Sequence, residues 1–293
     1  MGLLLALSGF ALLSMGDAVI KSIAGAWPGS AIAALRYALG ASGLGALLWW
    51  HEGRTGFVMP NPKIQLVRGA SVSIATICFF SAIFLMPLAE ATAITFTSPM
   101  ITALLAALIL KERAGRATIL ASLVAFLGVM VILRPNFAEL GLAALLPLAT
   151  ATGMACLMIG NRAVSGKGSV LLMQFLTAAV AAPILAVVAI AGHFSGMPAL
   201  AVPAPDWTII AKIAVVAVSA STAHWLIYLG TTRASAADIA PMTYVQLLIA
   251  MVLGVILFRD WPDAMSLLGS AIIIGAGLFL WHQNHSQGRI ETL

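Results

Sequence analysis

The chain has 293 residues, of which 61% are hydrophobic and only 9% are charged, whereas about a quarter of the residues of a soluble domain are charged. This composition excludes an ordinary soluble protein and indicates an integral membrane protein. The net charge of +5 does not indicate nucleic-acid binding, because the basic residues are spread through short polar segments and form no patch.

Apolar runs separated by polar residues predict ten membrane-spanning helices. Their ranges are 3–24, 28–50, 67–87, 91–110, 117–134, 140–160, 169–192, 209–229, 238–258 and 264–282. A span takes about 20 apolar residues, so the segments between spans are too short for a separate soluble domain. The first run has no basic residue before it and no small-residue cleavage site, so we expect a retained helix and not a secretory signal.

The distribution of basic residues predicts the orientation. With the N-terminus inside, ten Lys and Arg residues flank the spans on the cytoplasmic side and four flank them on the outside, which obeys the positive-inside rule. The ten are Arg54, Lys63, Arg68, Lys111, Arg113, Arg116, Arg162, Lys167, Arg233 and Arg289, and the four are Lys21, Arg134, Lys212 and Arg259. We therefore expect a multi-pass membrane protein with both termini in the cytoplasm.

The sequence carries a weak internal repeat. A shift of 148 positions aligns Ala89-Glu90 with Ala237-Asp238 and Lys111-Glu112 with Arg259-Asp260. The repeat predicts two five-helix units, residues 1–137 and 138–282, followed by a cytoplasmic tail, 283–293. An odd number of helices inserts the second unit upside down, and such inverted repeats hold substrate between them near the membrane midplane. The alternative is a chance alignment of apolar helices that use few residue types.

Several short motifs carry a resemblance to a known family. They are Ala34-Leu35-Arg36-Tyr37, Leu110-Lys111-Glu112-Arg113, Gly128-Val129, Phe258-Arg259-Asp260, and Gly269 with Gly277. With these motifs the chain resembles the drug/metabolite transporter (DMT) superfamily, in particular its ten-helix group of two EamA-type units, and within that group the YddG-type amino-acid exporters. The resemblance implies an all-α membrane protein with two inverted five-helix repeats around a central cavity. The halves differ, since Leu247 stands where the first half has Pro99.

Two charged residues lie within predicted spans. Asp17 and Arg36 each stand about 12 Å from the turn between the first two spans, at 1.5 Å per residue, so the two side chains are candidates for a pair. An intramembrane charge is costly and requires a partner. One interpretation is an ion pair that only fixes two helices together. The other is a site that binds a zwitterion, or an Asp17 that titrates during coupling.

Other polar and aromatic residues of the spans are candidates for binding substrate. His224 and Tyr228 share a helix face by their spacing, and Thr95, Tyr244 and Gln246 add polar groups. Aromatic and thioether side chains that are candidates for an apolar cavity are Phe79, Phe80, Phe84, Phe96, Met154 and Met158. For each of these residues the alternative is packing, lipid contact or a hydrogen bond to its own helix backbone.

These observations favour a secondary transporter that exports amino acids, aromatic or other neutral ones, or related small metabolites by alternating access. A multidrug or other metabolite exporter or facilitator of the same architecture is the alternative. No phosphate-binding loop, His-Glu-x-x-His run or other catalytic set is present in the sequence, so we expect no enzyme activity, cofactor or metal. We expect a small-molecule substrate, lipid around a monomer, and no nucleic acid. The sequence leaves open the substrate, the direction of transport and its coupling to protons, to exchange or to neither.

Overall fold

The computed structural model of the protein describes residues 1–109, 116–231, 233 and 240–290. The regular elements of these residues are all helical. The longer α-helices are α1 (Gly2–Lys21), α2 (Gly29–Glu52), α3 (Pro62–Leu85), α6 (Arg116–Leu140), α7 (Leu146–Ala163), α8 (Val170–His193), α9 (Trp207–Thr231) and α12 (Ala264–Ile290). The shorter α-helices are α4 (Leu88–Thr95), α5 (Ser98–Ile109) and α11 (Tyr244–Leu253).

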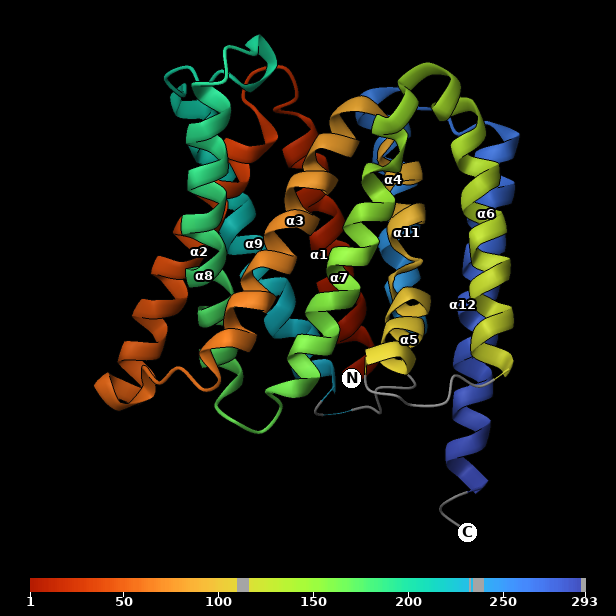
Figure 1. The fold of residues 1–293 in the computed structure, drawn as a ribbon, viewed down its shortest axis with the longest axis horizontal. Coiled ribbons are helices and arrows are strands. Elements are labelled where there is room, and N and C mark those ends of the chain that lie inside the picture. The colour runs from red at the N-terminus through yellow and green to blue at the C-terminus, as the bar shows by residue number, and fades with distance from the viewer. Residues whose placement is uncertain (110–115, 232, 234–239, 291–293) are drawn as a thin grey trace.

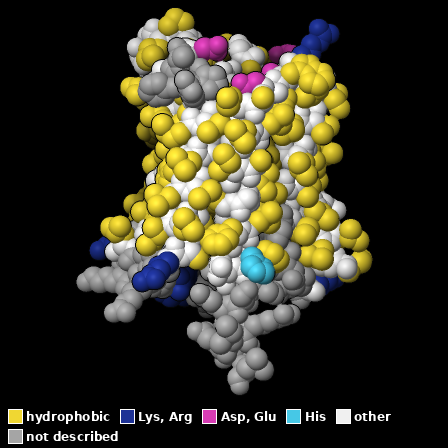
Figure 2. Space-filling view, turned by 90° about the vertical axis from the view of Figure 1, so that its right-hand side faces the viewer, with side chains coloured by type: hydrophobic (Ala, Val, Ile, Leu, Met, Phe, Trp, Pro, Cys, Tyr) yellow, Lys and Arg dark blue, Asp and Glu magenta, His cyan; other side chains and the backbone are white. Residues whose placement is uncertain are grey.

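The helices run side by side as one bundle, as Figure 1 shows. Among the described residues, eight helical segments are long and apolar enough to cross a membrane, and two shorter apolar helices cover Ile119–Leu133 and Tyr244–Phe258. On the face in Figure 2, hydrophobic side chains cover the middle, Lys and Arg lie mostly near the lower end, and carboxylates lie near the upper end. The chain is a multi-pass membrane protein.

Both termini lie at the lower end of the bundle in Figure 1. Because α1 starts at that end, Lys21 at its last residue lies at the opposite, upper end. We call these the terminal end and the opposite end. The exposed Lys63, at the start of α3, lies at the terminal end after an even number of crossings.

Helices from the two halves of the chain pair with one another. α1 packs along α9, α3 along α7, α2 along α8, and α6 along α12. The α6–α12 pair stands at one side of Figure 1, and α4, α5 and α11 lie between this pair and the other helices. The polar and aromatic residues of α4 and α11 are therefore placed inside the bundle.

Glycines allow three of these pairs to approach closely. A side chain at Gly9 of α1 would meet the Ala223 carbonyl of α9 at 2.7 Å, and one at Gly153 of α7 would meet the Ser71 carbonyl of α3 at 2.8 Å. In the α6–α12 pair, a side chain at Gly269 would meet the Gly128 carbonyl at 2.7 Å. Small residues at such positions let membrane helices pack backbone to backbone.

Two of the predicted spans are interrupted helices. The span predicted at 91–110 consists of α4 and α5, which are separated at Phe96 and Thr97. Pro99 has no N–H to bond the Thr95 carbonyl four residues earlier, which explains a break at this place. The span predicted at 238–258 begins, in its described part, with the 3₁₀ turn η4 (Ala240–Thr243), continues as α11, and ends as the π-helical segment η5 (Gly254–Phe258).

Three predicted boundaries differ from the structure. α3 begins at Pro62, five residues before the predicted start of this span at 67. α6 runs to Leu140, past the unit boundary expected at 137, and the chain turns at Gly141, whose φ is 57°. α12 continues to Ile290, so the segment 283–290 of the expected tail is helical. The lengths of the apolar runs did not reveal these ends, because each of these helices also contains polar residues. Such residues extend a helix beyond its apolar part or pair with other polar residues inside the bundle.

Candidate substrate site

The centre of the candidate site is the contact between the two interrupted helices. Phe96, at the end of α4, packs edge to face on Tyr244, the first residue of α11, with 5.7 Å between ring centroids. The Tyr244 hydroxyl lies directly against Gly277 of α12, where a side chain would meet it at 1.6 Å. The breaks in both helices therefore position two aromatic rings against each other between α4, α11 and α12.

Asp17 is bound to the same interrupted helix. The Gln246 side chain of α11 donates a hydrogen bond to the Asp17 carboxylate over 3.1 Å. One turn earlier in α1, the Ser14 hydroxyl donates to the Gln246 carbonyl over 3.0 Å. Both contacts join the first half of the chain to the second, and Asp17 itself is only partly buried.

Arg36 lies over aromatic rings and not against the Asp17 carboxylate. Its guanidinium carbon is 5.4 Å from the centroid of the Tyr37 ring and 5.7 Å from that of Phe80 in α3. Among the described residues, no hydrogen bond or ion pair joins Arg36 to Asp17, although the charge of Arg36 acts electrostatically on Asp17 and on His224. The structure thus places the two predicted partners near each other without direct contact.

His224 of α9 retains exposed surface, and its Nδ1 lies 2.7 Å from the Ala220 carbonyl of its own helix. Its other ring nitrogen is left for another partner. Tyr228, predicted on the same face, belongs to α9, but its side chain lies outside the described part of the structure, as do Lys111 and Glu112.

The remaining predicted site residues are mostly packed in the core. Phe80 is almost fully buried, and Phe79, Phe84, Phe96 and Met154 pack against the same cluster of buried residues. Met158 is 46% exposed. The Thr95 hydroxyl donates to the Ala91 carbonyl of its own helix over 2.9 Å. Of this group, Phe80 and Phe96 contact the charged and aromatic residues described above.

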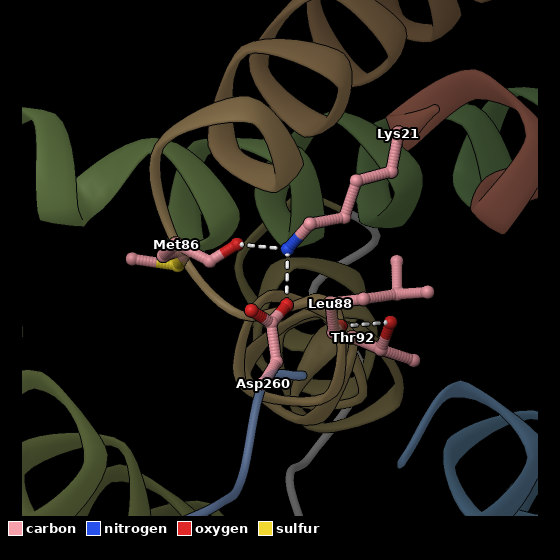
Figure 3. A network of polar contacts seen from close by, with 5 residues as sticks. All are labelled: Lys21, Met86, Leu88, Thr92 and Asp260. Atoms are coloured by element: carbon pink, nitrogen blue, oxygen red, sulfur yellow. Dashed lines mark hydrogen bonds and ion pairs between the residues drawn. The ribbon is translucent and has the colours of Figure 1, made fainter. Parts of the chain in front are cut away.

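An ion pair that the sequence did not reveal lies at the opposite end. Lys21 Nζ lies 2.6 Å from Asp260 Oδ2 and donates to the Met86 carbonyl over 2.9 Å, as Figure 3 shows. Its nitrogen also lies 5.2 Å from the centroid of the Phe258 ring. The side chains are only 12% and 23% exposed. These contacts tie the end of α1 to the α3–α4 turn and to the end of η5, and we call them the Lys21–Asp260 latch.

A second missed contact joins α4 to α12. The Ser266 hydroxyl donates to the Glu90 carboxylate over 2.6 Å, and both side chains are buried. Asp263 accepts a hydrogen bond from the Ser266 N–H over 2.6 Å and so caps the start of α12. Hydrogen bonding from the Ser266 side chain and backbone holds the pKa of Asp263 below its usual value.

At the terminal end, Arg68 connects α3 to α7 and α8. It donates to the Asn161 side chain over 2.7 Å and to the Met173 carbonyl over 3.2 Å, and it also bonds Gln65. Arg68 is only 4% exposed. The sequence placed it among the cytoplasmic charges, and only the packing of α7 against α3 reveals its partner.

Within the described residues, no group of three His, Cys, Asp or Glu side chains is arranged to hold a metal ion. The site offers a carboxylate, a guanidinium, an imidazole, an amide and aromatic rings. Groups of these kinds contact small polar molecules in proteins by charge, hydrogen bonds and ring contact.

Comparison with known proteins supports the architecture. Residues 1–134 match the EamA-like transporter family. An S-adenosylmethionine uptake transporter of Rickettsia bellii is 25% identical over 230 residues, covering 78% of this chain and 76% of that protein. The pseudopaline exporter CntI of Pseudomonas aeruginosa is 27% identical over 282 residues, covering 95% of both chains. A riboflavin transporter of Brucella anthropi is 25% identical over 226 residues, covering 77% of this chain and 78% of that protein.

A solved structure, titled only as the crystal structure of a protein, has the same fold. It superposes with a TM-score of 0.61 over 95% of both chains at 19% sequence identity. The family match and the relatives support a function as a membrane transporter of small molecules.

Proposed function

We propose that the protein is a secondary transporter of a bacterial inner membrane that exports amino acids or related small metabolites by alternating access. The observation that carries this proposal is the meeting of two interrupted helices, α4 with α5 and α11 with η5, beside Asp17. Transporters of inverted-repeat architecture bind substrate where broken helices meet at the interface of the repeats.

The helix pairs support an inverted repeat of five helices. If α1 corresponds to α7 and α3 to α9, then the α1–α9 pair and the α7–α3 pair exchange with each other. The α2–α8 and α6–α12 pairs map onto themselves. Such a set of contacts is expected when two equivalent units are related by a twofold axis in the membrane plane.

Sequence correspondences support the same alignment. Gly9 and Gly16 of α1 stand 144 positions before Gly153 and Gly160 of α7. Gly9 and Gly153 are close-approach positions, each against the helix that the repeat assigns to it. One chain therefore contains both halves of the transporter, so we propose a monomer, with both termini in the cytoplasm.

Alternating access requires that each end of the bundle close in turn. In the proposed orientation the opposite end faces outward, and the Lys21–Asp260 latch closes it. Arg68 links the two halves at the cytoplasmic end through Asn161 and Met173. Transport would break one of these sets of contacts while the other holds.

The proposal is tested with purified protein in liposomes loaded with labelled compounds. The panel contains L-phenylalanine, L-leucine and L-threonine, together with S-adenosylmethionine and riboflavin, because the relatives are named for the last two. We expect saturable efflux of at least one amino acid, at a rate above that from loaded liposomes without protein. Flux of riboflavin alone would favour the other metabolite exporters, and background rates for the whole panel would refute the proposal.

Coupling is tested in the same liposomes. Efflux is measured with and without an imposed pH gradient, and with and without unlabelled substrate outside. Acceleration by the gradient identifies proton coupling, and acceleration by outside substrate identifies exchange. Equal rates under all conditions identify facilitated movement down the gradient.

A further inference from the structure

Arg36 has a charge that no side chain of the described structure satisfies. A guanidinium carries five N–H donors, yet the contacts of Arg36 are with the faces of the Tyr37 and Phe80 rings. Arg36 is only partly buried. Among the described residues, the buried side-chain atoms that lack a hydrogen-bond partner do not include its nitrogens. Its donors are therefore accessible to a bound molecule.

The rings beneath Arg36 are held in place by neighbouring helices. The Tyr37 hydroxyl lies 3.1 Å from the Thr76 hydroxyl of α3. Phe80 is 1% exposed, and its backbone and Cβ pack on Gly29 of α2. The guanidinium thus rests on a rigid aromatic surface, and its fork of donors suits a carboxylate, which accepts two parallel hydrogen bonds.

Asp17 supplies the opposite charge on the neighbouring helix. Gln246 donates to only one of its carboxylate oxygens, Oδ2. The second oxygen has no hydrogen bond from the described residues and remains available to a cation. Because Asp17 and Arg36 interact electrostatically but are not in contact, they offer two separate poles to one molecule.

We propose that Asp17 and Arg36 form a two-pole subsite for an amphoteric substrate, in which Arg36 binds a carboxylate and Asp17 binds an ammonium group. This inference rests on the proposed transport function and narrows its substrate to small molecules that carry both charges, as α-amino acids do. Neither pole needs an ion from solution, since the substrate itself supplies both counter-charges inside the membrane, where an unpaired charge is costly.

The test measures equilibrium binding to the purified full chain in lipid nanodiscs. The three probes are L-phenylalanine, its amide, which keeps only the ammonium, and 3-phenylpropionate, which keeps only the carboxylate. Loss of one charge-assisted hydrogen-bonding group is expected to weaken binding by about tenfold or more. The wild-type protein should therefore prefer L-phenylalanine to both analogues.

The variants assign each pole. Arg36→Gln should remove the preference for L-phenylalanine over the amide while the amide still binds as it does to the wild type. Asp17→Asn should remove the preference over 3-phenylpropionate in the same way. Arg36→Lys and Asp17→Glu keep the charges and should retain most of the selectivity. Arg54→Gln is the matched control, because Arg54 also lies over a ring, that of Trp49, at an exposed position.

Three results would overturn the inference. They are an Arg36→Gln protein that loses affinity for all three probes equally while it unfolds at the wild-type temperature, selectivity that neither variant changes, and a wild-type protein that binds none of the probes. Binding with the expected selectivity but no flux in liposomes would refute the transport proposal and leave the subsite standing. Flux in liposomes without charge-selective binding would refute the subsite and leave the transport proposal standing.

Discussion

Gly277 shows how one missing side chain sets the position of a site residue. A Cβ at this place would lie 1.6 Å from the Tyr244 hydroxyl and 2.9 Å from the ring carbon that bears it. Gly275, on the same helix, has no heavy atom within 4 Å of the equivalent point. The two glycines are alike in the sequence, and only the packing of α11 separates their roles.

We expect Gly277→Ala to displace Tyr244 and to lower the free energy of unfolding by about 1–3 kcal/mol, as overpacking does. Thermal unfolding in detergent measures this change. Gly275→Ala is the control and should have no destabilising effect. Tyr244→Phe in the Gly277→Ala background removes the closest atom and should recover part of the loss. Equal effects of the two alanines would contradict the placement of Tyr244.

Asp263 gives a prediction that depends on pH. Because the folded protein holds the pKa of this carboxyl below its unfolded value of about 3.9, its contribution to stability is complete above that value. The contribution falls as the pH drops through the lower, folded pKa. Asp263→Ala leaves the Ser266 N–H without its cap and should cost about 1 kcal/mol at neutral pH.

Hydrogen exchange of residues 264–267 measures this fraying. The difference between the wild-type protein and Asp263→Ala should be constant near neutrality and should shrink below about pH 4. Asp263→Asn keeps a capping oxygen without the charge, so its protection should not depend on this titration. A difference in exchange between the wild-type protein and Asp263→Ala that grows on acidification would contradict the assignment of Asp263 as the cap.

Residue positions along the chain predicted part of the site. Counting from the turn between the first two spans predicted Asp17 and Arg36 as a pair, whereas the hydrogen-bond partner of Asp17 is Gln246, which lies far away in the sequence. Apolar runs do not show which helices pack against each other, because each run is equally compatible with lipid. For the same reason, the sequence did not reveal the partners of Lys21, Glu90 and Arg68.

Among the elements, the interruptions of α4–α5 and of α11–η5 determine the position of the candidate site more than the exact helix ends do. Pro99, which has no N–H for the Thr95 carbonyl, explains the first of these, whereas the π-helical end of the second has no comparable sequence signal. Asp260 follows this π-helical segment, and Arg259 before it adopts a left-handed backbone with a φ of 58°. The irregular backbone thus presents Asp260 to Lys21.

We expect removal of either charge of the Lys21–Asp260 latch to open the outward end more often. A cysteine at Thr92, which is 3% exposed on α4, reports this opening in a protein whose Cys78 and Cys156 are serine. Labelling by a membrane-impermeant thiol reagent added outside should accelerate in Lys21→Met and in Asp260→Asn. Exchange of the two charges, Lys21→Asp with Asp260→Lys, should slow it again.

Lys63→Met is the matched control for this experiment, because Lys63 is exposed at the terminal end. It should leave the labelling rate unchanged. If the single latch variants label at the wild-type rate, the pair stabilises the fold without closing the outward end.

At the scale of the molecule, composition alone predicted a multi-pass membrane protein, and the family match and the relatives support a transporter. The proposed internal repeat leaves only short alignments in the sequence, as is expected where lipid accepts any apolar residue. The constraint that persists is geometric: Gly9 and Gly153 keep their helices in close contact. The structure therefore adds the pairing of helices between halves, which the proposed mechanism requires.

In the proposed mechanism the two halves of the bundle move against each other and open it at alternate ends. Cross-linking of Lys21→Cys to Asp260→Cys by a short bifunctional thiol reagent tests it, with substrate efflux from liposomes as the readout and a cleavable linker to reverse the bond. We expect cross-linking to stop efflux and cleavage to restore it, while single-cysteine proteins treated alike remain active. Undiminished efflux from the fully cross-linked protein would contradict it.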